Sequence, residues 1–433
     1  SMNSLEHYYG RLFTSEQLTD ALKKQAKALP AMIDHKTHAE CCRCGSKVFS
    51  NYQLQTGALY CRECLVFGRN TNQQSLYYFP QKPFPKEDVL VWKGQLTPYQ
   101  ENISQGMLKA IAAKKDLLVH AVTGAGKTEM IYHAIATVIA NGGCVGLASP
   151  RIDVCLELYK RLSQDFACKI SLLYGGSEKY QRAPLVISTT HQLLKFYQAF
   201  DLLIIDEVDA FPFVDNHMLY HAVEQSLKKE GSKIYLTATS TDQLDKQVQS
   251  GKLAKLHLPR RFHANPLVVP KNIWLSGVLK HMQKGQLPRA FMKILTKQRQ
   301  TKYPLLIFFP NIAQGQVFTK ILKTYLPHEN IAFVSSQTEN RLEIVNQFRQ
   351  QELSILVTTT ILERGVTFPC VDVFVMLAHH RLYTKSALVQ ISGRVGRAKE
   401  RPTGALLFLH EGITKPMTKA IAEIKEMNKR GGF

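Results

Sequence analysis

The chain has 433 residues, of which 45% are hydrophobic and 21% are charged, which excludes a wholly disordered, collagen-like or coiled-coil protein. Lys and Arg outnumber Asp and Glu by 55 to 34, and the formal net charge of +21 predicts a polyanionic partner, nucleic acid before an anionic membrane surface. No run of 18 apolar residues and no signal-peptide pattern is present, so we expect a cytoplasmic protein.

The first part of the chain divides into a polar segment and a cysteine block. Residues 1–36 place Leu18, Leu22 and Leu29 at roughly helical spacing and predict an N-terminal helical extension. Residues 37–88 hold two CxxC pairs separated by sixteen residues, a pattern that can supply four thiolates to one tetrahedral structural Zn²⁺. The predicted ligands are Cys41, Cys44, Cys61 and Cys64. Cys42 is surplus, and a redox pair or an iron–sulfur cluster is the alternative reading.

Two successive α/β units follow, over residues 89–262 and 263–433. Continuous apolar runs separated by helix-length segments predict parallel sheets that are covered on both faces. The fold class is therefore α/β, with two tandem parallel-sheet domains and a small N-terminal zinc-ribbon-like domain. The predicted strands are 117–119, 145–148, 185–188, 202–205 and 234–237, then 305–309, 331–334, 355–358, 373–377 and 405–409.

A phosphate-binding loop follows the first of these strands. Ala121 to Thr128 reads AVTGAGKT, which matches the P-loop pattern except that Ala stands at its first position. Small residues let backbone N–H groups surround a phosphate, Lys127 can reach the β- and γ-phosphates, and Thr128 can ligate Mg²⁺. The predicted ATP and Mg²⁺ contacts are Thr123, Gly124, Ala125, Gly126, Lys127 and Thr128.

Two adjacent carboxylates end the strand at 202–205. The carboxyl end of a parallel strand is where Mg²⁺ and a water-activating base are expected in such nucleotide sites. Asp206 is predicted to hold Mg²⁺, and Glu207 to orient and deprotonate the attacking water.

Three motifs in order resemble the DExD/H helicases of superfamily 2, which implies that the two α/β units are tandem RecA-like domains. Asp206 to Asp209 is similar to motif II, Thr237-Ala238-Thr239 to motif III, and Gln390 to Arg397 to motif VI. The resemblance implies that Arg394 and Arg397 reach the γ-phosphate of ATP, where a fixed guanidinium charge stabilises the transferring group. It also implies that Asp209, Thr237, Thr239, Gln390 and Gly393 couple hydrolysis to domain motion.

Weaker segments agree with this resemblance. Gln100 occupies the position of the adenine-reading glutamine. Four further segments resemble those that hold the backbone of one nucleic-acid strand in such motors. The residues implied are Pro150, Arg151, Gly175, Gly176, Thr190, His191, Thr359 and Thr360.

The join between the two units is basic. Residues 246–328 contain fifteen Lys and Arg and no Asp or Glu, and we expect part of this stretch to face a nucleic-acid backbone. Arg289, Lys293 and Lys297 recur every four residues, so a helix would line them along one face opposite Phe291 and Leu295.

The cysteine block ahead of a two-unit core, and the run DEVDAFPF from Asp206, resemble the ComFA family of late-competence ATPases. This resemblance implies an ATPase and translocase that is stimulated by single-stranded DNA and draws the transforming strand through a membrane channel from the cytosolic face. It also implies a ComFC-like phosphoribosyltransferase-family partner and assembly into homo-oligomers.

Other interpretations remain open. A PriA-like replication-restart helicase carries its zinc cysteines inside the second motor unit, and a DEAD-box RNA helicase rarely has an N-terminal zinc ribbon. A non-hydrolysing zinc-ribbon nucleic-acid adaptor would need a degenerate ATP site, whereas Lys127, Glu207, Arg394 and Arg397 are all present. The basic surface also suits an anionic membrane leaflet.

Overall fold

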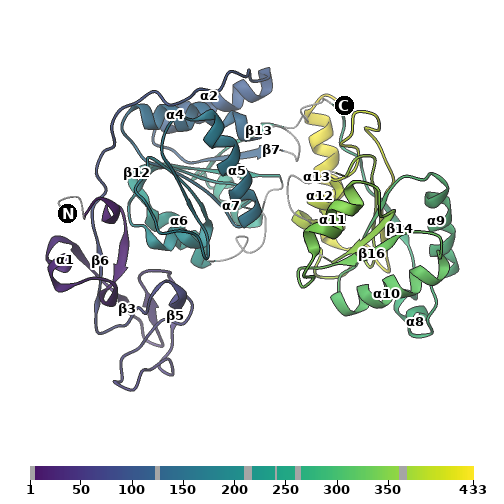
Figure 1. Cartoon of the computed structure of the whole chain (residues 1–433), viewed down its shortest axis with the longest axis horizontal. Helices are drawn as coiled ribbons and strands as arrows, with labels where there is room; N and C mark the ends of the chain where they lie inside the picture. The colour runs from purple at the N-terminus through teal and green to yellow at the C-terminus, as the bar shows by residue number, and fades with distance from the viewer. Residues whose placement is uncertain (1–4, 122–126, 209–216, 239–240, 259–264, 360–367) are drawn as a thin grey trace. The chain divides into compact units, whose positions relative to one another are not determined.

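The computed structural model describes residues 5–121, 127–208, 217–238, 241–258, 265–359 and 368–433 (Figure 1). The chain divides into two compact units, of which the first ends at residue 257 and the second begins at residue 258. Among the described residues, no helix has both the length and the hydropathy needed to cross a bilayer.

The N-terminal region of the first unit consists of two small antiparallel sheets. One has the order β1-β6-β2 and the other the order β3-β4-β5. The elements are β1 (Leu12–Thr14), α1 (Asp20–Gln25), β2 (Lys27–Pro30), β3 (Met32–Asp34), β4 (Ala39–Cys41), β5 (Lys47–Val48) and β6 (Ser75–Tyr78).

The predicted helical extension over residues 1–36 is wrong for the part that the structure describes. Its one α-helix, α1, has six residues and ends before β2. Thr19 caps its N-terminus, because the Thr19 side chain accepts a hydrogen bond from the N–H of Leu22. Leu29 lies in β2 opposite Leu76 of β6. For Leu29, pairing with a strand that is distant in sequence outweighs the local helical spacing, because it packs this side chain against the core of Leu12, Ala31 and Leu76.

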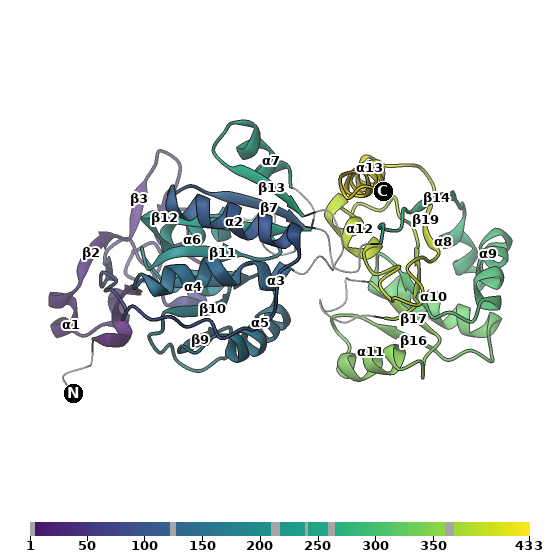
Figure 2. The ribbon, with the colours of Figure 1, turned by 90° about the horizontal axis from the view of Figure 1, so that it is seen from above.

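The remainder of the first unit is a seven-stranded sheet of order β13-β7-β12-β11-β8-β10-β9, whose six strands from β7 to β9 pair in parallel. Helices α2 and α4 cover one face and α6 the other (Figures 1 and 2). The strands are β7 (Leu117–Ala121), β8 (Val145–Ser149), β9 (Ile170–Leu173), β10 (Leu185–Thr189), β11 (Phe200–Ile205), β12 (Leu227–Thr237) and β13 (Ala254–Leu258). The helices are α2 (Pro98–Ala112), α3 (Lys127–Met130), α4 (Tyr132–Ala140), α5 (Ile152–Asp165), α6 (His217–Ser226) and α7 (Asp242–Gln249).

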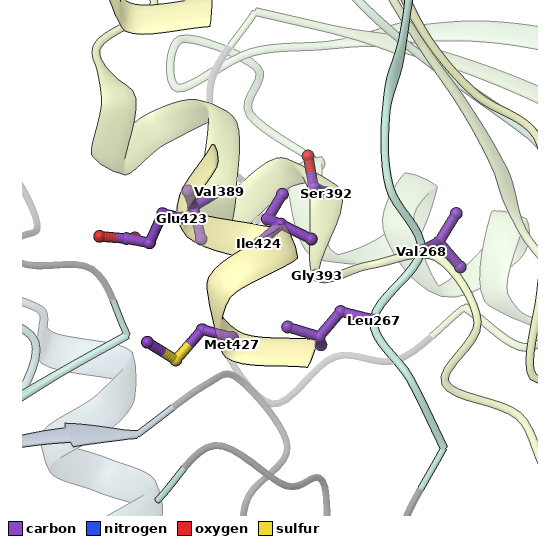
Figure 3. A pocket seen from close by; sticks show the side chains of 8 residues that line it. All are labelled: Leu267, Val268, Val389, Ser392, Gly393, Glu423, Ile424 and Met427. Atoms are coloured by element: carbon purple, nitrogen blue, oxygen red, sulfur yellow. The ribbon is translucent and has the colours of Figure 1, made fainter. Parts of the chain in front are cut away.

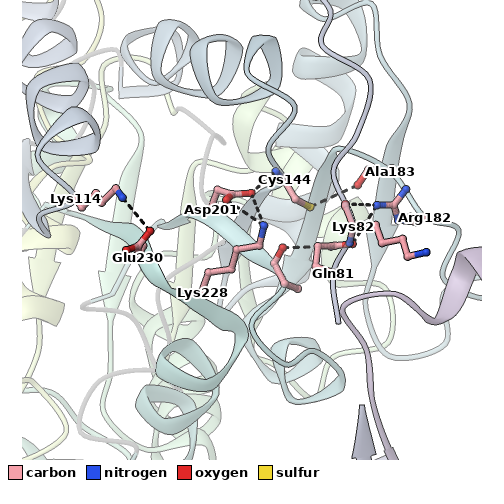
Figure 4. Close-up of polar contacts among 10 residues, drawn as sticks. Gln81, Lys82, Lys114, Cys144, Arg182, Ala183, Asp201, Lys228 and Glu230 are labelled. Carbon is pink, nitrogen blue, oxygen red and sulfur yellow. Dashed lines mark hydrogen bonds and ion pairs between the residues drawn. The ribbon is translucent and has the colours of Figure 1, made fainter. Parts of the chain in front are cut away.

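A proline-rich segment connects the N-terminal region to this sheet and is held against it (Figure 4). Gln81 Nε2 donates to the carbonyl oxygen of Ala199 at 3.2 Å, and Arg182 donates to Gln81 Oε1 at 3.2 Å. The N–H of Phe84 donates to the carbonyl oxygen of Gly142 at 2.9 Å. The connection is therefore part of the first unit's surface.

The second unit is a parallel six-stranded sheet of order β14-β19-β18-β15-β17-β16. Helix α12 packs on α13, while α10 and α11 contact β16 and β17. The strands are β14 (Lys271–Trp274), β15 (Leu305–Phe308), β16 (Ile331–Val334), β17 (Ile355–Thr358), β18 (Asp372–Val375) and β19 (Leu406–His410). The helices are α8 (Val278–Gln283), α9 (Arg289–Gln300), α10 (Ile312–Tyr325), α11 (Arg341–Arg349), α12 (Lys385–Ser392) and α13 (Lys415–Arg430).

The predicted fold class is confirmed. All ten predicted strands form, nine of them within two residues of their expected bounds, whereas β12 begins seven residues before the predicted 234. The central strands β11 and β15 are buried along their apolar runs, as both-face coverage by helices requires.

Candidate active site and metal centre

The sheet order arranges the predicted site residues of the first unit along one edge. β7 precedes Lys127, β12 ends at Thr237, and β11 ends before Asp206. β8, β10 and β9 lie next in the sheet and precede the predicted nucleic-acid segments at 150–151, 190–191 and 175–176. Since parallel strands all end at the same edge, the predicted nucleotide residues share one half of that edge and the predicted nucleic-acid residues share the other.

Lys127 and Asp206 form the centre of the nucleotide half. Lys127 Nζ lies 3.5 Å from Asp206 Oδ1, and the two side chains are only 9% and 11% exposed. Two such charges are stable in a buried position because each offsets the other's loss of hydration. A phosphate chain and its Mg²⁺ would supply the same compensation, the phosphates to the ammonium and the cation to the carboxylate.

Glu207 follows directly and has an unusual backbone. Its φ is +58°, in the left-handed region, and the residue is 3% exposed. The N–H of Val208 donates to the carbonyl oxygen of Leu236 in β12, which fixes the turn after Glu207. A buried non-glycine residue with positive φ is typical of a functional turn.

Gln100, the predicted adenine-reading residue, lies in the first turn of α2, ahead of the P-loop in the chain. It is 3% exposed, and its side-chain oxygen accepts a hydrogen bond from the N–H of Thr97 at 2.9 Å while the Thr97 hydroxyl caps helix α2. The capping box therefore occupies the amide oxygen, and the amide nitrogen is the group that can donate to an adenine while the cap is intact.

The predicted nucleic-acid residues of the first unit differ in accessibility. Gly175 and Gly176 are exposed, and a Cβ at either position would meet nothing within 4 Å. Arg151 pairs with both carboxylate oxygens of Asp153, at 3.2 and 3.1 Å. Pro150 and Thr190 are buried, so their side chains are not presented to a strand, although their backbones lie at the edge.

Several predicted residues lie outside the described part of the chain. They are Thr123, Gly124, Ala125 and Gly126 of the P-loop, Asp209 of motif II, Thr239 of motif III and Thr360 of motif V. Their roles stay predictions. Thr128 opens α3 beside Lys127, and His191 is half-buried, which lowers the pKa of its imidazole.

In the second unit, motif VI begins in the last turn of helix α12 and continues into the turn after it. Gly393 caps the C-terminus of α12, Arg394 is 6% exposed and Arg397 is half-buried. Figure 3 shows apolar side chains of α12 and α13 meeting Leu267 and Val268 beside Gly393. Gly396 has φ +74°, and a Cβ there would lie 2.7 Å from the carbonyl oxygen of Pro402, so only glycine fits this turn.

The basic helix forms as predicted. In α9, Arg289, Lys293 and Lys297 are exposed, whereas Phe291 and Leu295 are buried. Gln390 is half-buried in α12, and Thr359 is 4% exposed after β17.

The four predicted cysteine ligands converge. Cys41, Cys44, Cys61 and Cys64 are fully buried, and their sulfurs lie within 4.8 Å of one another. The Cys41–Cys64 and Cys44–Cys61 sulfur pairs are 3.7 and 3.6 Å apart. These spacings match the about 3.8 Å between sulfurs bound at about 2.3 Å to a tetrahedral ion. None of the nine cysteines forms a disulfide.

Polar groups that the sequence analysis missed surround this cluster. Arg43, only 2% exposed, donates from Nε and Nη2 to Cys64 Sγ at 3.3 and 3.1 Å. Asn70 Nδ2 donates to Cys41 Sγ at 3.2 Å. Four thiolates around a divalent ion carry excess negative charge, which a buried guanidinium offsets, so the environment fits an occupied metal centre. The signal in the sequence was an arginine inside the first CxxC pair.

The cluster is packed into the first unit. Its cysteines share a hydrophobic core with Leu219, Ala222 and Val223 of α6. His221 Nε2 of the same helix lies 3.2 Å from the carbonyl oxygen of Cys42. Gly45 has φ +77°, and a Cβ there would lie 2.9 Å from His221 Nδ1, so the turn of the first CxxC pair and the contact with α6 both require glycine.

Two RecA-like sheets with these motifs define the class of protein. The family model described as "DEAD/DEAH box helicase" matches residues 97–247. The model described as "Helicase conserved C-terminal domain" matches residues 286–399. S. cerevisiae Dbp5 bound to RNA and ADP BeF3 shares the fold with a TM-score of 0.50 and 17% identity, over 77% of this chain and 91% of that one. RecG bound to a three-way DNA junction shares the fold with a TM-score of 0.51 and 15% identity, over 78% of this chain and 47% of that one. The chain is a DEAD/DEAH helicase-family ATPase.

Comparison with curated proteins narrows the class. The description "Competence protein ComFA N-terminal domain" matches residues 7–78. Competence protein ComFA of Streptococcus pneumoniae is 60% identical over 98% of this chain and 99% of its own length. ComFA of Bacillus subtilis is 39% identical over 91% and 87%. The chain belongs to the ComFA family of competence proteins, as the sequence predicted.

Proposed function

We propose that this chain is an ATPase and translocase, stimulated by single-stranded DNA, that drives uptake of the transforming strand into the cytosol during natural competence. The observation that carries the proposal is the buried Lys127–Asp206 pair beside Glu207, at the carboxyl edge of a sheet in a ComFA-family chain. Mg²⁺–ATP would replace that ion pair, and Glu207 would take the proton of the attacking water.

The remaining roles follow from the motifs. Arg394 and Arg397 are proposed to stabilise the charge on the transferring phosphoryl group, and Thr237 and Gln390 to couple hydrolysis to motion. The burial of Arg394 supports a role that depends on a fixed side-chain position.

The metal is proposed to be one structural Zn²⁺. Four thiolates from two CxxC pairs leave no open coordination position, so the ion would stabilise the module without taking part in hydrolysis. Arg43 and Asn70 would hold the ligand sulfurs in position through their hydrogen bonds.

The proposed partners come from the family. They are single-stranded DNA, a ComFC-like phosphoribosyltransferase-family protein and the DNA-uptake channel. The chain itself is proposed to be cytoplasmic, to act at the inner face of the membrane and to assemble as a homo-oligomer. The net charge of +21 supports a polyanionic partner but does not separate DNA from the membrane surface.

The direct test is Mg²⁺-dependent ATP hydrolysis measured without nucleic acid and with single-stranded DNA, double-stranded DNA or RNA. Stimulation by single-stranded DNA alone is the expected result. Stimulation chiefly by RNA would contradict the proposal, and a complete lack of hydrolysis would favour the non-hydrolysing adaptor.

A further inference from the structure

The carboxyl edge of the second sheet carries an exposed tryptophan. Trp274 ends the edge strand β14 and is 63% exposed. It lies in the acid-free basic stretch noted above, and the chain has only one other tryptophan. An exposed tryptophan at the edge where α/β sheets bind their ligands has a large apolar surface available for a partner.

A histidine contacts Trp274, and a second histidine links the two neighbouring loops. The His410 ring, at the end of β19, meets the Trp274 ring at 89° with centroids 5.9 Å apart. His379 Nδ1, after β18, accepts a hydrogen bond from the N–H of Glu411 at 3.1 Å, and His410 Nδ1 accepts one from the N–H of Gly412 at 2.9 Å. The loops after β14, β19 and β18 are thus joined into one surface.

His410 contributes an aromatic ring to this surface. Its Nδ1 accepts a backbone N–H, a role that requires this ring nitrogen to carry no proton. Burial, followed by the influence of His379, also lowers the pKa of His410. Glu411 lies in the loop after β19, and its Oε1 accepts a hydrogen bond from the N–H of Gly277 at 2.9 Å. This bond ties the loop after β19 to the loop after β14.

The same edge carries a predicted nucleic-acid residue. Thr359 follows β17, and the sheet order places β15, β18 and β19 between β17 and β14. Four strand spacings of about 4.8 Å separate the two ends by about 19 Å, a length comparable with a few nucleotides of single strand.

From these observations we propose that Trp274, supported edge-on by His410, is a stacking platform for a base of single-stranded nucleic acid. The inference rests on the proposed binding of single-stranded DNA. It adds a contact to the face of a base, whereas the basic residues would contact phosphates. Aromatic rings accept the face of any base, which suits a motor that must move along any sequence.

Intrinsic fluorescence tests the platform. The chain has two tryptophans, and Trp92 packs at 87° against Tyr132 in the first unit. A Trp92→Phe variant leaves Trp274 as the only tryptophan, so its emission is isolated by exciting at wavelengths that tyrosine does not absorb. Oligothymidylate is expected to quench Trp274, whereas an abasic phosphodiester strand of equal length is not. Trp274 emission unchanged at saturating oligothymidylate would overturn the proposal.

Affinity measurements separate stacking from charge. Trp274→Ala is expected to weaken oligothymidylate binding roughly 5- to 150-fold, with the salt dependence unchanged, and Trp274→Phe to retain most of the affinity. The Trp92→Phe control should bind as the unaltered chain does. If Trp274→Ala lowers the melting temperature without weakening oligothymidylate binding, the ring only stabilises the end of β14. The stacking proposal then fails, and the proposed function of the chain is unaffected. If the unaltered chain binds no single-stranded DNA, the proposed function fails with it.

Discussion

Glu207 has a backbone conformation that is unfavourable for any residue with a Cβ, by about 1–3 kcal/mol. Its φ of +58° is maintained by the buried turn between β11 and Leu236. The cost is consistent with a carboxylate that must face one fixed position beside Lys127 and Asp206.

Glu207→Gln is therefore expected to reduce ATP turnover by about 10²- to 10⁴-fold while ATP binding is retained, since the amide cannot accept the proton of water. Phosphate release and binding of a fluorescent ATP analogue measure the two properties. Lys127→Ala is the contrasting variant and should lose ATP binding itself. Normal turnover of Glu207→Gln would show that another group is the base.

Arg43 gives a second prediction for a single residue. Its guanidinium donates two hydrogen bonds to Cys64 Sγ and one to the carbonyl oxygen of Phe67. Arg43→Met removes both the charge and the donors, and we expect metal affinity to fall about 10- to 100-fold. Competition with a colorimetric chelator measures this, and exposed Lys47→Gln in the same module is the control. Equal metal retention by both variants would contradict a role for Arg43.

Helix α9 has one buried apolar face and one exposed basic face. Phe291 and Leu295 anchor it on the second sheet, and three cations project to solvent. Like charges four residues apart destabilise a helix by about 0.2–0.5 kcal/mol per pair, so a polyanion on this face would relieve a cost that the isolated helix bears.

Replacing Arg289, Lys293 and Lys297 together by Gln should weaken binding to single-stranded DNA. Each lost phosphate contact reduces the slope of log affinity against log salt by about 0.7, so three contacts would reduce it by about 2. The matched control replaces exposed Lys419, Lys425 and Lys429 of α13 by Gln, with the same loss of charge. Identical slopes for both triple variants would place the DNA contacts elsewhere.

At the scale of the whole molecule, the metal module and the first sheet share a hydrophobic core within one compact unit. The cysteines and α6 share a core, and His221 contacts the turn of the first CxxC pair. Helix α6 is also the first described element after the motif II carboxylates, so loss of the metal is expected to affect more than the module.

We expect chelation, or the double change Cys61→Ser and Cys64→Ser, to lower the Tm of the first unit. A domain of this size loses about 2–4 °C for each kcal/mol. Calorimetry with elemental analysis of zinc measures both effects. Cys370→Ser in the second unit is the control and should keep its zinc. A metal-free protein with an unchanged Tm for the first sheet would show that the module unfolds independently.

The sequence by itself determined the two parallel sheets and the identity of the chemical groups. Continuous apolar runs are diagnostic of strands buried on both faces, and the P-loop, the motif II carboxylates and the CxxC pairs are local in the chain. The family resemblance rested on the same local motifs. Nothing in that local information could show that the helix around Leu22 ends at Gln25 and that Leu29 pairs with a strand instead.

The tertiary structure decided what depends on residues distant in sequence. The order of strands placed the predicted nucleotide and nucleic-acid residues of the first unit on two halves of one edge. Long-range packing brought Arg43, Asn70 and α6 to the cysteine cluster. Trp274 belongs here too, because its exposure depends on β14 being an edge strand. The physical reason is that burial and hydrogen-bond partners are properties of the folded chain, whereas periodicity and ligand spacing are already present in the sequence.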